Sequence, residues 1–488
     1  MIDEGPDGTI EVLPETSANS DVPAPKQPSS KSVILVVSTI ILVILLGIIA
    51  VKFTRRGGKK PVTRPLSSPT EAPRPSPSDA GGSSSGSGFC DKGSTISCSE
   101  LGSVWRSGTG VCMTDESGYD VSSCVASGKG EMVKPAERDP KRWATARCND
   151  GTPFGFEVEL SDSGSKDWVL YLQGGGFCDD DIIPCRERSE QLRSSPKPQD
   201  KAGAPLAQEG ILGRTKATNP TFAQANHVFA YYCSSDGWSG ATASKHANSA
   251  SQGGWYFSGR LNVAAMTELL KMSYGLDDTN KETTVLLTGG SAGGAGAMAN
   301  ADNLASLLPK TAKRGALKIL NDAGHIPDFD NPNYRPKNST LSVRDALVKA
   351  TSFWGSRLNP LCENAHPGNP GECFFTDIVH SYISDPPPKG LGLPFMLQAS
   401  SIDSFVMGLH GIDNATRDKK AIEEYRGNAL ASFRGIDWVF SGGEKPYHMT
   451  LLKDGPQGWH MGPNGDTLEE LVTRFWEGKP PKQVLFGN

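Results

Sequence analysis

A short apolar run that leads directly into glycines and alanines, TTVLLTGGSAGGAGAMANAD (residues 283–302), constrains the fold more than any other feature. The run predicts a buried strand, and the small residues predict a closely packed helix. Ser291 lies between the two, which is typical of the sharp turn that carries the nucleophile in α/β-hydrolases. Residues 294–299 also match a dinucleotide-binding turn, but they lie too far beyond the strand.

Other apolar runs alternate with helical patterns over residues 143–488, which therefore predict one α/β domain. The runs are unbroken, as expected for a mainly parallel sheet that helices cover on both faces. The expected strands are residues 169–173, 227–233, 284–289, 316–320 and 394–398, and the expected helices are residues 257–272, 342–355 and 466–476. Asp466 and Glu469 are expected to form a capping box at the last helix.

The first 88 residues contain one candidate element, an apolar stretch. Residues 1–32 are rich in proline, serine and acidic residues, and residues 52–88 in proline, serine and glycine, so neither segment is expected to form a core. Residues 33–51 carry no charge and are long enough to cross a bilayer as one helix. A cleaved signal peptide is the alternative, but its apolar core would be shorter and nearer the N-terminus. The sequence thus predicts a single-pass membrane anchor followed by a linker.

Two features disagree about the orientation of the large domain. Five basic residues follow the apolar stretch within residues 52–60, and such charge favours the cytosol. All ten cysteines and two glycosylation sequons, at Asn338 and Asn414, also follow it and favour the lumen of the Golgi or the cell surface. We give the cysteines more weight than the basic residues and expect the large domain on the lumenal or extracellular side. A net charge of −5, without a basic patch in the large domain, argues against nucleic-acid binding.

Residues 89–142 form a Cys-rich segment with few large apolar residues. Four cysteines there predict two disulfides whose pairing the sequence leaves open, and they are Cys90, Cys98, Cys112 and Cys124. A zinc site is the alternative, but no spacing is Cys-x-x-Cys and no histidine lies among them. We therefore expect neither a metal ion nor a cofactor.

A catalytic serine needs a histidine base and an acid that orients it, and α/β-hydrolases place them after the serine in the order acid, histidine. Asp322 and Asp403 each follow an expected strand. If Asp403 is the acid, spacing leaves His448 and His460 equally open, because His410 lies too close along the chain.

Backbone N–H groups from two places are candidates for binding the oxyanion of the reaction. Residues 174–176 are glycines directly after an expected strand, and glycine lets the backbone approach a substrate closely. Ala292 begins the helix after the serine, so its N–H faces the same site.

Six blocks of sequence resemble, in order, those of the pectin acetylesterase/Notum family. They are RCNDGTPFGF (147–156), YLQGGGFCDD (171–180), YYCSSDGWSGATASK (231–245), GGSAGGAG (289–296), NDAGHIPDF (321–329) and LQASSIDSF (397–405). The resemblance covers residues 143–480 and implies an α/β-hydrolase-type carboxylesterase. Plant and microbial members remove acetyl groups from pectin, and Notum removes a palmitoleoyl ester from Wnt proteins.

The resemblance also implies individual roles. It makes Ser291 the nucleophile, Asp403 the acid and His448, in YHMTLLKDGPQGWHMGP, the base. It further implies oxyanion donors at Gly175, Gly176 and Ala292 and disulfides Cys148–Cys233, Cys178–Cys185 and Cys362–Cys373.

The chain departs from the family at a few positions. Gly176 matches plant members, where Notum has tryptophan, whereas residues 236–240 are closer to Notum. Gln173 replaces a glutamate, and Pro446 and Tyr447 stand where a cysteine usually precedes the histidine, which leaves the histidine loop less firmly placed.

From these features we expect a membrane-anchored serine esterase that acts on an acylated substrate, namely acetyl esters of a polysaccharide. A Notum-like deacylase of a lipidated protein and an inactive cell-surface binding protein on the same scaffold are the alternatives.

Overall fold

The computed structural model describes residues 89–179, 183–197, 209–244, 254–337, 339–412, 418–442, 446–463 and 465–485. The expected tail (1–32), membrane helix (33–51) and linker (52–88) lie outside this part of the chain, and so do Asn338 and Asn414. Within the part that is described, none of the helices has both the length and the apolar character needed to cross a bilayer.

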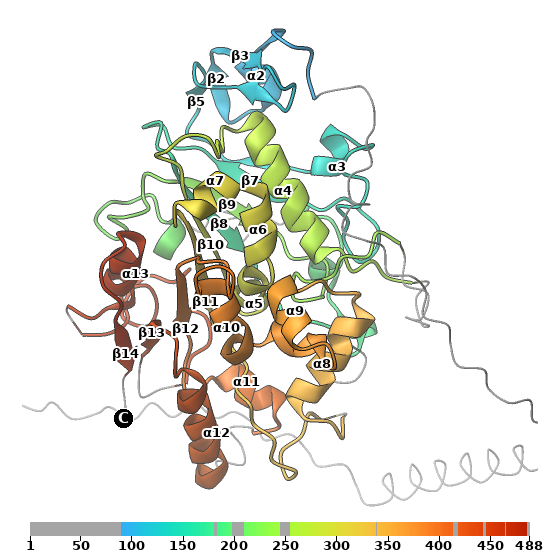
Figure 1. Cartoon of the computed structure of the whole chain (residues 1–488), viewed down its shortest axis with the longest axis vertical. Helices are drawn as coiled ribbons and strands as arrows, with labels where there is room; N and C mark the ends of the chain where they lie inside the picture. The colour runs from blue at the N-terminus through green and yellow to red at the C-terminus, as the bar shows by residue number, and fades with distance from the viewer. Residues whose placement is uncertain are drawn as a thin grey trace, which may run out of the picture. The chain divides into compact units, whose positions relative to one another are not determined.

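A mixed sheet forms the centre of the fold, with nine strands among the described residues in the order β14-β13-β12-β11-β10-β8-β9-β7-β6 (Figure 1). Neighbouring strands are parallel from β14 to β9, and β7 is antiparallel to both of its neighbours. The strands are β6 (Glu131–Val133), β7 (Phe156–Glu159), β8 (Asp167–Leu172), β9 (Asn226–Ala230), β10 (Thr284–Gly290), β11 (Leu317–Asp322), β12 (Phe395–Gln398), β13 (Trp438–Ser441) and β14 (Gln483–Leu485).

The five expected strands all lie in the parallel part of this sheet, as β8 to β12. The sequence patterns do not predict β6, β7, β13 or β14, which have only three or four residues each. Since β6 begins at Glu131, the central sheet starts inside the segment 89–142 that is expected to be Cys-rich.

Helices cover both faces of the sheet and explain why the strands are apolar throughout. The helices are α3 (Pro135–Arg138), α4 (Gly259–Ser273), α5 (Ala292–Ala299), α6 (Ala301–Leu307), α7 (Pro309–Lys313), α8 (Val343–Phe353), α9 (Pro360–Ala365), α10 (Thr376–Ser384), α11 (Ser404–Leu409), α12 (Lys419–Ser432) and α13 (Leu468–Trp476). Leu287 of β10 belongs to a core with α4 and α5, whereas its neighbour Leu286 belongs to a second core with α13. Alternate side chains of a strand point to opposite faces of the sheet. Because helices cover both faces, the side chains on both sides of a strand must be apolar.

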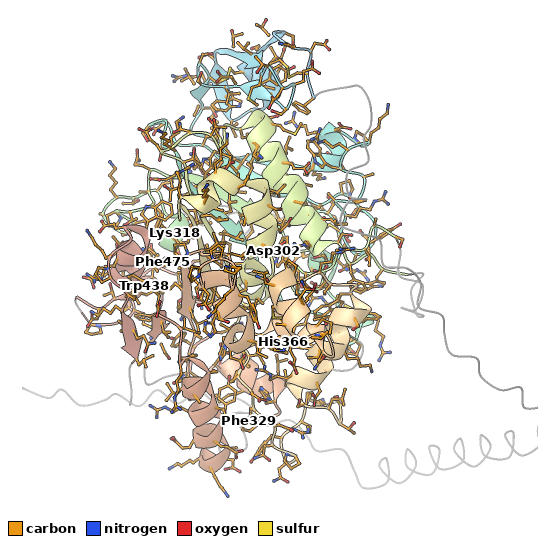
Figure 2. All side chains as sticks on the ribbon, viewed as in Figure 1. Asp302, Lys318, Phe329, His366, Trp438 and Phe475 are labelled. Carbon is orange, nitrogen blue, oxygen red and sulfur yellow. A yellow bond between two sulfur atoms is a disulfide. The ribbon has the colours of Figure 1, made fainter. Side chains whose placement is uncertain are left out.

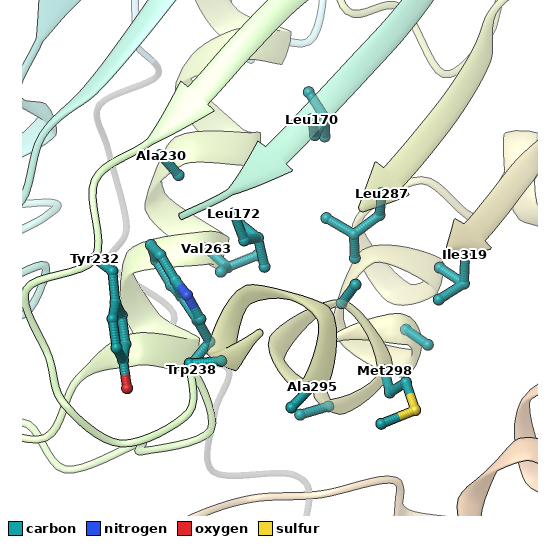
Figure 3. Close-up of a cluster of buried hydrophobic side chains, with 14 of the residues drawn as sticks. Leu170, Leu172, Ala230, Tyr232, Trp238, Val263, Leu287, Ala295, Met298 and Ile319 are labelled. Atoms are coloured by element: carbon teal, nitrogen blue, oxygen red, sulfur yellow. The ribbon is translucent and has the colours of Figure 1, made fainter. Parts of the chain in front are cut away.

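The two cores pack different kinds of side chain against the sheet. Figure 3 shows Leu172 and Leu287 facing α5, whose Ala295 and Met298 lie beneath the strands. On the other face, Phe475 of α13 packs against Trp438 with ring centroids 5.6 Å apart, and Lys318 Nζ lies 5.6 Å from the Phe475 ring (Figure 2). The small residues of α5 let this helix approach the sheet more closely than bulky side chains would.

Helix starts follow the sequence patterns with one correction. Ser342 caps α8 as expected, with its hydroxyl accepting from Asp345 N. At α13 the capping box consists of Thr467 and Glu470, one residue later than expected. The Thr467 hydroxyl accepts from Glu470 N, and the Glu470 carboxylate accepts from Thr467 N. Asp466 precedes the N-cap residue by one position and therefore cannot form this pair.

The Cys-rich segment forms small strands held by two disulfides, Cys90–Cys112 and Cys98–Cys124. Its elements are β1 (Thr95–Ser97), α2 (Cys98–Leu101), β2 (Trp105–Ser107), β3 (Thr109–Cys112), β4 (Tyr119–Asp120) and β5 (Val125–Ala126). Trp105 Nε1 donates to Ser273 O at the end of α4, so the segment packs on the larger domain.

Candidate active site

Ser291 lies at the turn between β10 and α5 in a backbone conformation that serine rarely adopts. Its φ is 57° and its ψ is −121°, and its N–H donates to Asp322 O at 2.7 Å. A Cβ at Gly293 would lie 1.9 Å from Leu172 O, so only glycine allows the helix to pass this close to β8. The sequence around the serine therefore forms the sharp strand–turn–helix that was expected.

Asp403 holds His448 through one carboxylate oxygen and begins α11 with the other. His448 Nδ1 lies 2.7 Å from Asp403 Oδ2, while Oδ1 accepts from Phe405 N at 2.9 Å and Val406 N at 3.0 Å. The carboxylate is nearly fully buried, so its orientation is strongly restrained. The interaction selects His448 rather than His460 as the partner of Asp403.

The second ring nitrogen of His448, Nε2, is available to bind another group. Nε2 is buried and has no hydrogen-bond partner among the described residues. His448 and Ser291 line the same cavity, which brings the two side chains to one site from positions far apart in the sequence. The Phe405 ring packs on the imidazole with centroids 4.8 Å apart.

This cavity is small and largely apolar. Its volume is about 30 Å³, and the side chains of Phe177, Ile326, Phe374, Phe405, Val406 and Leu409 form its walls. An ideal Cβ at Gly237 would lie 2.6 Å from Phe374 Cζ, so this ring closely packs against the backbone at the edge of the cavity.

The glycines after β8 pass directly beside the serine. A Cβ at Gly174 would lie 2.4 Å from Gly290 O and 3.1 Å from Ser291 Cβ. Gly176 and Ala292 line the cavity, whereas Gly175 does not. Gly175 has a φ of 145° and Gly176 a φ of 68°, both in the region that favours glycine.

Asp322, the other candidate acid, does not pair with His448 but holds the loop that follows it. Its buried carboxylate accepts from Thr450 N at 3.2 Å, from the Thr450 hydroxyl at 3.2 Å and from Leu451 N at 3.1 Å. Burial raises the pKa of Asp322 to about 6, against the hydrogen bonds from Leu451 and Thr450. The sequence made Asp322 a candidate for the acid that orients the histidine; in the structure it instead binds Thr450 and Leu451.

The histidine loop is also anchored on the other side of His448. The Tyr447 hydroxyl accepts from Gly442 N at 2.9 Å and from Gln398 Nε2 at 3.2 Å. Together with the bonds to Asp322, this contact holds the loop without the cysteine that usually precedes the family histidine.

The large domain contains three disulfides among the described residues, namely Cys148–Cys233, Cys178–Cys185 and Cys362–Cys373. These are the pairs that the family resemblance implies. Cys178 lies two residues after Gly176, and Cys373 directly precedes Phe374, so two of the bridges restrain the walls of the cavity. Among the residues that the structure describes, no cluster of three or more His, Cys, Asp or Glu side chains is arranged to hold a metal ion.

Comparisons with known proteins find similar sequences over about half of the chain. Palmitoleoyl-protein carboxylesterase notum1a of Danio rerio is 33% identical over 248 residues, which cover 49% of this chain and 46% of that protein. Palmitoleoyl-protein carboxylesterase NOTUM of Drosophila melanogaster is 30% identical over 267 residues, covering 54% and 38% respectively. The chain thus spans half or less of the length of these curated relatives.

The fold is shared with a solved structure of the Wnt deacylase Notum from Drosophila. The TM-score is 0.59 at 23% sequence identity, and the alignment covers 70% of this chain and 94% of that chain. The family model described as pectinacetylesterase matches residues 132–387, which is more than half of the 488 residues. The chain therefore belongs to the pectinacetylesterase family.

Proposed function

We propose that this chain is a serine carboxylic ester hydrolase that removes acetyl groups from a polysaccharide. The observation that carries the proposal is the 2.7 Å contact between His448 Nδ1 and Asp403, with Ser291 at a strained turn in the same cavity. A serine, a histidine and a buried carboxylate in this relation are the parts that acyl transfer requires.

In the proposed mechanism, His448 Nε2 takes the proton of the Ser291 hydroxyl as its oxygen attacks the ester carbonyl carbon. Asp403 keeps the proton of the imidazole on Nδ1, so that Nε2 is free to act as the base. The backbone N–H groups of Gly176 and Ala292 bind the oxyanion. His448 then protonates the leaving alcohol, and a water molecule that it activates releases the acid from the acyl-enzyme.

Exchange of the nucleophile and of the base tests this mechanism. Ser291→Ala and His448→Ala in the full-length chain should each lower turnover of p-nitrophenyl acetate by at least about 10³-fold. His460→Ala is the matched control, because His460 makes no contact with Asp403 that would orient it, and it should keep wild-type turnover. Retained hydrolysis in Ser291→Ala would disprove the assignment of the nucleophile.

The apolar cavity beside Ser291 can accept the methyl group of an acetyl ester, and the match to the pectinacetylesterase family model supports that substrate. Gly176, which resembles the plant members, favours the same choice. Release of acetate from acetylated pectin by the wild type, but not by Ser291→Ala, is the expected result.

The names of the curated relatives support a second candidate, a deacylase of a lipidated protein. Comparing kcat/KM for p-nitrophenyl acetate and octanoate separates the two. A preference for octanoate of more than about tenfold would favour the second candidate. An inactive surface binding protein is the third reading, and covalent labelling of Ser291 by a fluorophosphonate would exclude it.

We further propose that residues 33–51 anchor the chain in a membrane, with the esterase domain on the lumenal or extracellular side. The five disulfides support an extracellular or lumenal domain, because such bonds persist in oxidising compartments. Glycans at Asn338 and Asn414 that are removed by an endoglycosidase, together with resistance to carbonate extraction from membranes, are the expected results. Digestion of the domain by a protease added on the cytosolic side of the membrane would contradict this topology.

A further inference from the structure

We propose that Arg188 is a positioning residue that orients the Gly175–Gly176 peptide so that its N–H faces the oxyanion. The inference rests on the proposed function, and the family resemblance does not assign this arginine a role. Arg188 Nη1 donates to Gly175 O at 2.7 Å. That carbonyl and the N–H of Gly176 belong to the same peptide group, so a bond at one end sets the direction of the other.

The peptide needs such a restraint because a glycine lies on each side of it. With φ of 145° at Gly175 and 68° at Gly176, this segment occupies conformations in which glycine has little preference for one orientation. Rotation of the peptide plane by half a turn would exchange the carbonyl and the N–H. The carbonyl would then face the cavity and repel the developing negative charge.

Arg188 is itself held in place by several contacts. It is nearly buried, with 8% of its surface exposed. Its Nε donates to Ser235 Oγ at 2.9 Å, and its guanidinium carbon lies 5.9 Å from the centre of the Tyr232 ring. It follows the 3₁₀ helix η2 (Cys185–Glu187), which the Cys178–Cys185 disulfide ties to the loop after Gly176. The donor is therefore rigid relative to the glycines.

The charge of Arg188 adds to this geometric effect. A hydrogen bond from a cation polarises the carbonyl of Gly175, which makes the N–H of Gly176 a stronger donor. Among the described residues, Arg188 forms no salt bridge within 4.0 Å, although the buried carboxylate of Asp236 lies close enough to stabilise its charge, and Nη2 has no hydrogen-bond partner. The guanidinium donates to the peptide whose other end is the proposed oxyanion donor.

The test compares Arg188→Met and Arg188→Lys with the wild type in the full-length chain. Removing one oxyanion donor lowers kcat by about 10²–10³-fold, so losing its orientation should lower kcat by about 30- to 100-fold in Arg188→Met, with KM changed less than about threefold. Arg188→Lys keeps the charge and one donor, and should recover at least about fivefold of that loss. Arg186→Met is the matched control, because the Arg186 side chain is 63% exposed, and it should keep wild-type kcat.

A second measurement separates orientation from a general structural role. Inhibition by a trifluoromethyl ketone, which forms a tetrahedral oxyanion on the serine, should weaken by the same factor as kcat/KM falls. If Arg188→Met does not fold, as judged by thermal unfolding, Arg188→Gln replaces it in the comparison with Arg188→Lys.

The outcomes are distinguishable. A wild type without turnover overturns the proposed function and the role of Arg188 with it. A wild type that turns over, with kcat of a folded Arg188→Met within threefold of it, overturns the role of Arg188 alone. Equal losses in the Lys and Met variants, or unchanged inhibition by the ketone, also overturn it.

Discussion

Replacing Asp322 by asparagine should separate the stability of the domain from its activity. The carboxylate accepts the two N–H groups of Thr450 and Leu451 and the Thr450 hydroxyl. Asparagine has one acceptor oxygen, so at least one of these buried donors loses its partner, at a cost of about 1–3 kcal/mol. Against this loss, asparagine avoids the cost of a buried charge. A pKa raised from 3.8 to about 6 makes that cost about 3 kcal/mol at pH 7.

The sign of the pH dependence follows from the raised pKa. Between pH 3.8 and about 6 the folded wild type binds the proton of Asp322 more tightly than the unfolded chain does. The stability that this group contributes is therefore full below pH 3.8 and lost as the pH rises to about 6. From pH 4 to pH 7, the free energy of unfolding of Asp322→Asn should gain about 2 kcal/mol relative to the wild type.

Activity should respond differently from stability. A shift of the His448 loop by about 1 Å lowers turnover by about 10²-fold, so Asp322→Asn should be folded at pH 7 and nearly inactive. Denaturant unfolding at both pH values and p-nitrophenyl acetate hydrolysis at pH 7 measure the two effects. Thr450→Val, which removes only the hydroxyl donor, should lose less than about tenfold in kcat. A difference in stability that does not change with pH, or full activity of Asp322→Asn, would refute the reasoning.

Three further predictions concern packing beside the serine, within α12 and at the wall of the cavity. Gly293→Ala would bring a methyl group to 1.9 Å from Leu172 O and should prevent folding, whereas Gly427→Ala, with no atom within 4 Å of the new methyl group, should stabilise α12 by about 0.5–1 kcal/mol. Thermal unfolding measures both, and a folded, active Gly293→Ala would show that the turn is looser than described. Phe374→Ala removes a wall of the cavity and should raise the octanoate-to-acetate ratio of kcat/KM by about tenfold or more, while an unchanged ratio would show that acyl length is determined elsewhere.

Much of the fold could be predicted from the sequence because its signals are local. Five strands of the parallel sheet, α4, α8 and the turn at Ser291 each depend on residues within about one element of each other. The short strands β6, β7, β13 and β14 were not predicted. Their positions depend on pairing with strands far away in the sequence.

The site combines both kinds of information. By itself the sequence determined the strand, turn and helix around Ser291; spacing reduced the acid and the base to two candidates each, and the family resemblance chose Asp403 and His448. Only the tertiary structure brings these side chains into contact, since Asp403 reaches His448 across 45 residues and Asp322 reaches Leu451 across 129. It also brought Arg188, which no motif singles out, to the carbonyl of Gly175. The reason is that short-range patterns follow from backbone geometry, whereas contacts between distant loops form only when the completed sheet brings the ends of its strands together.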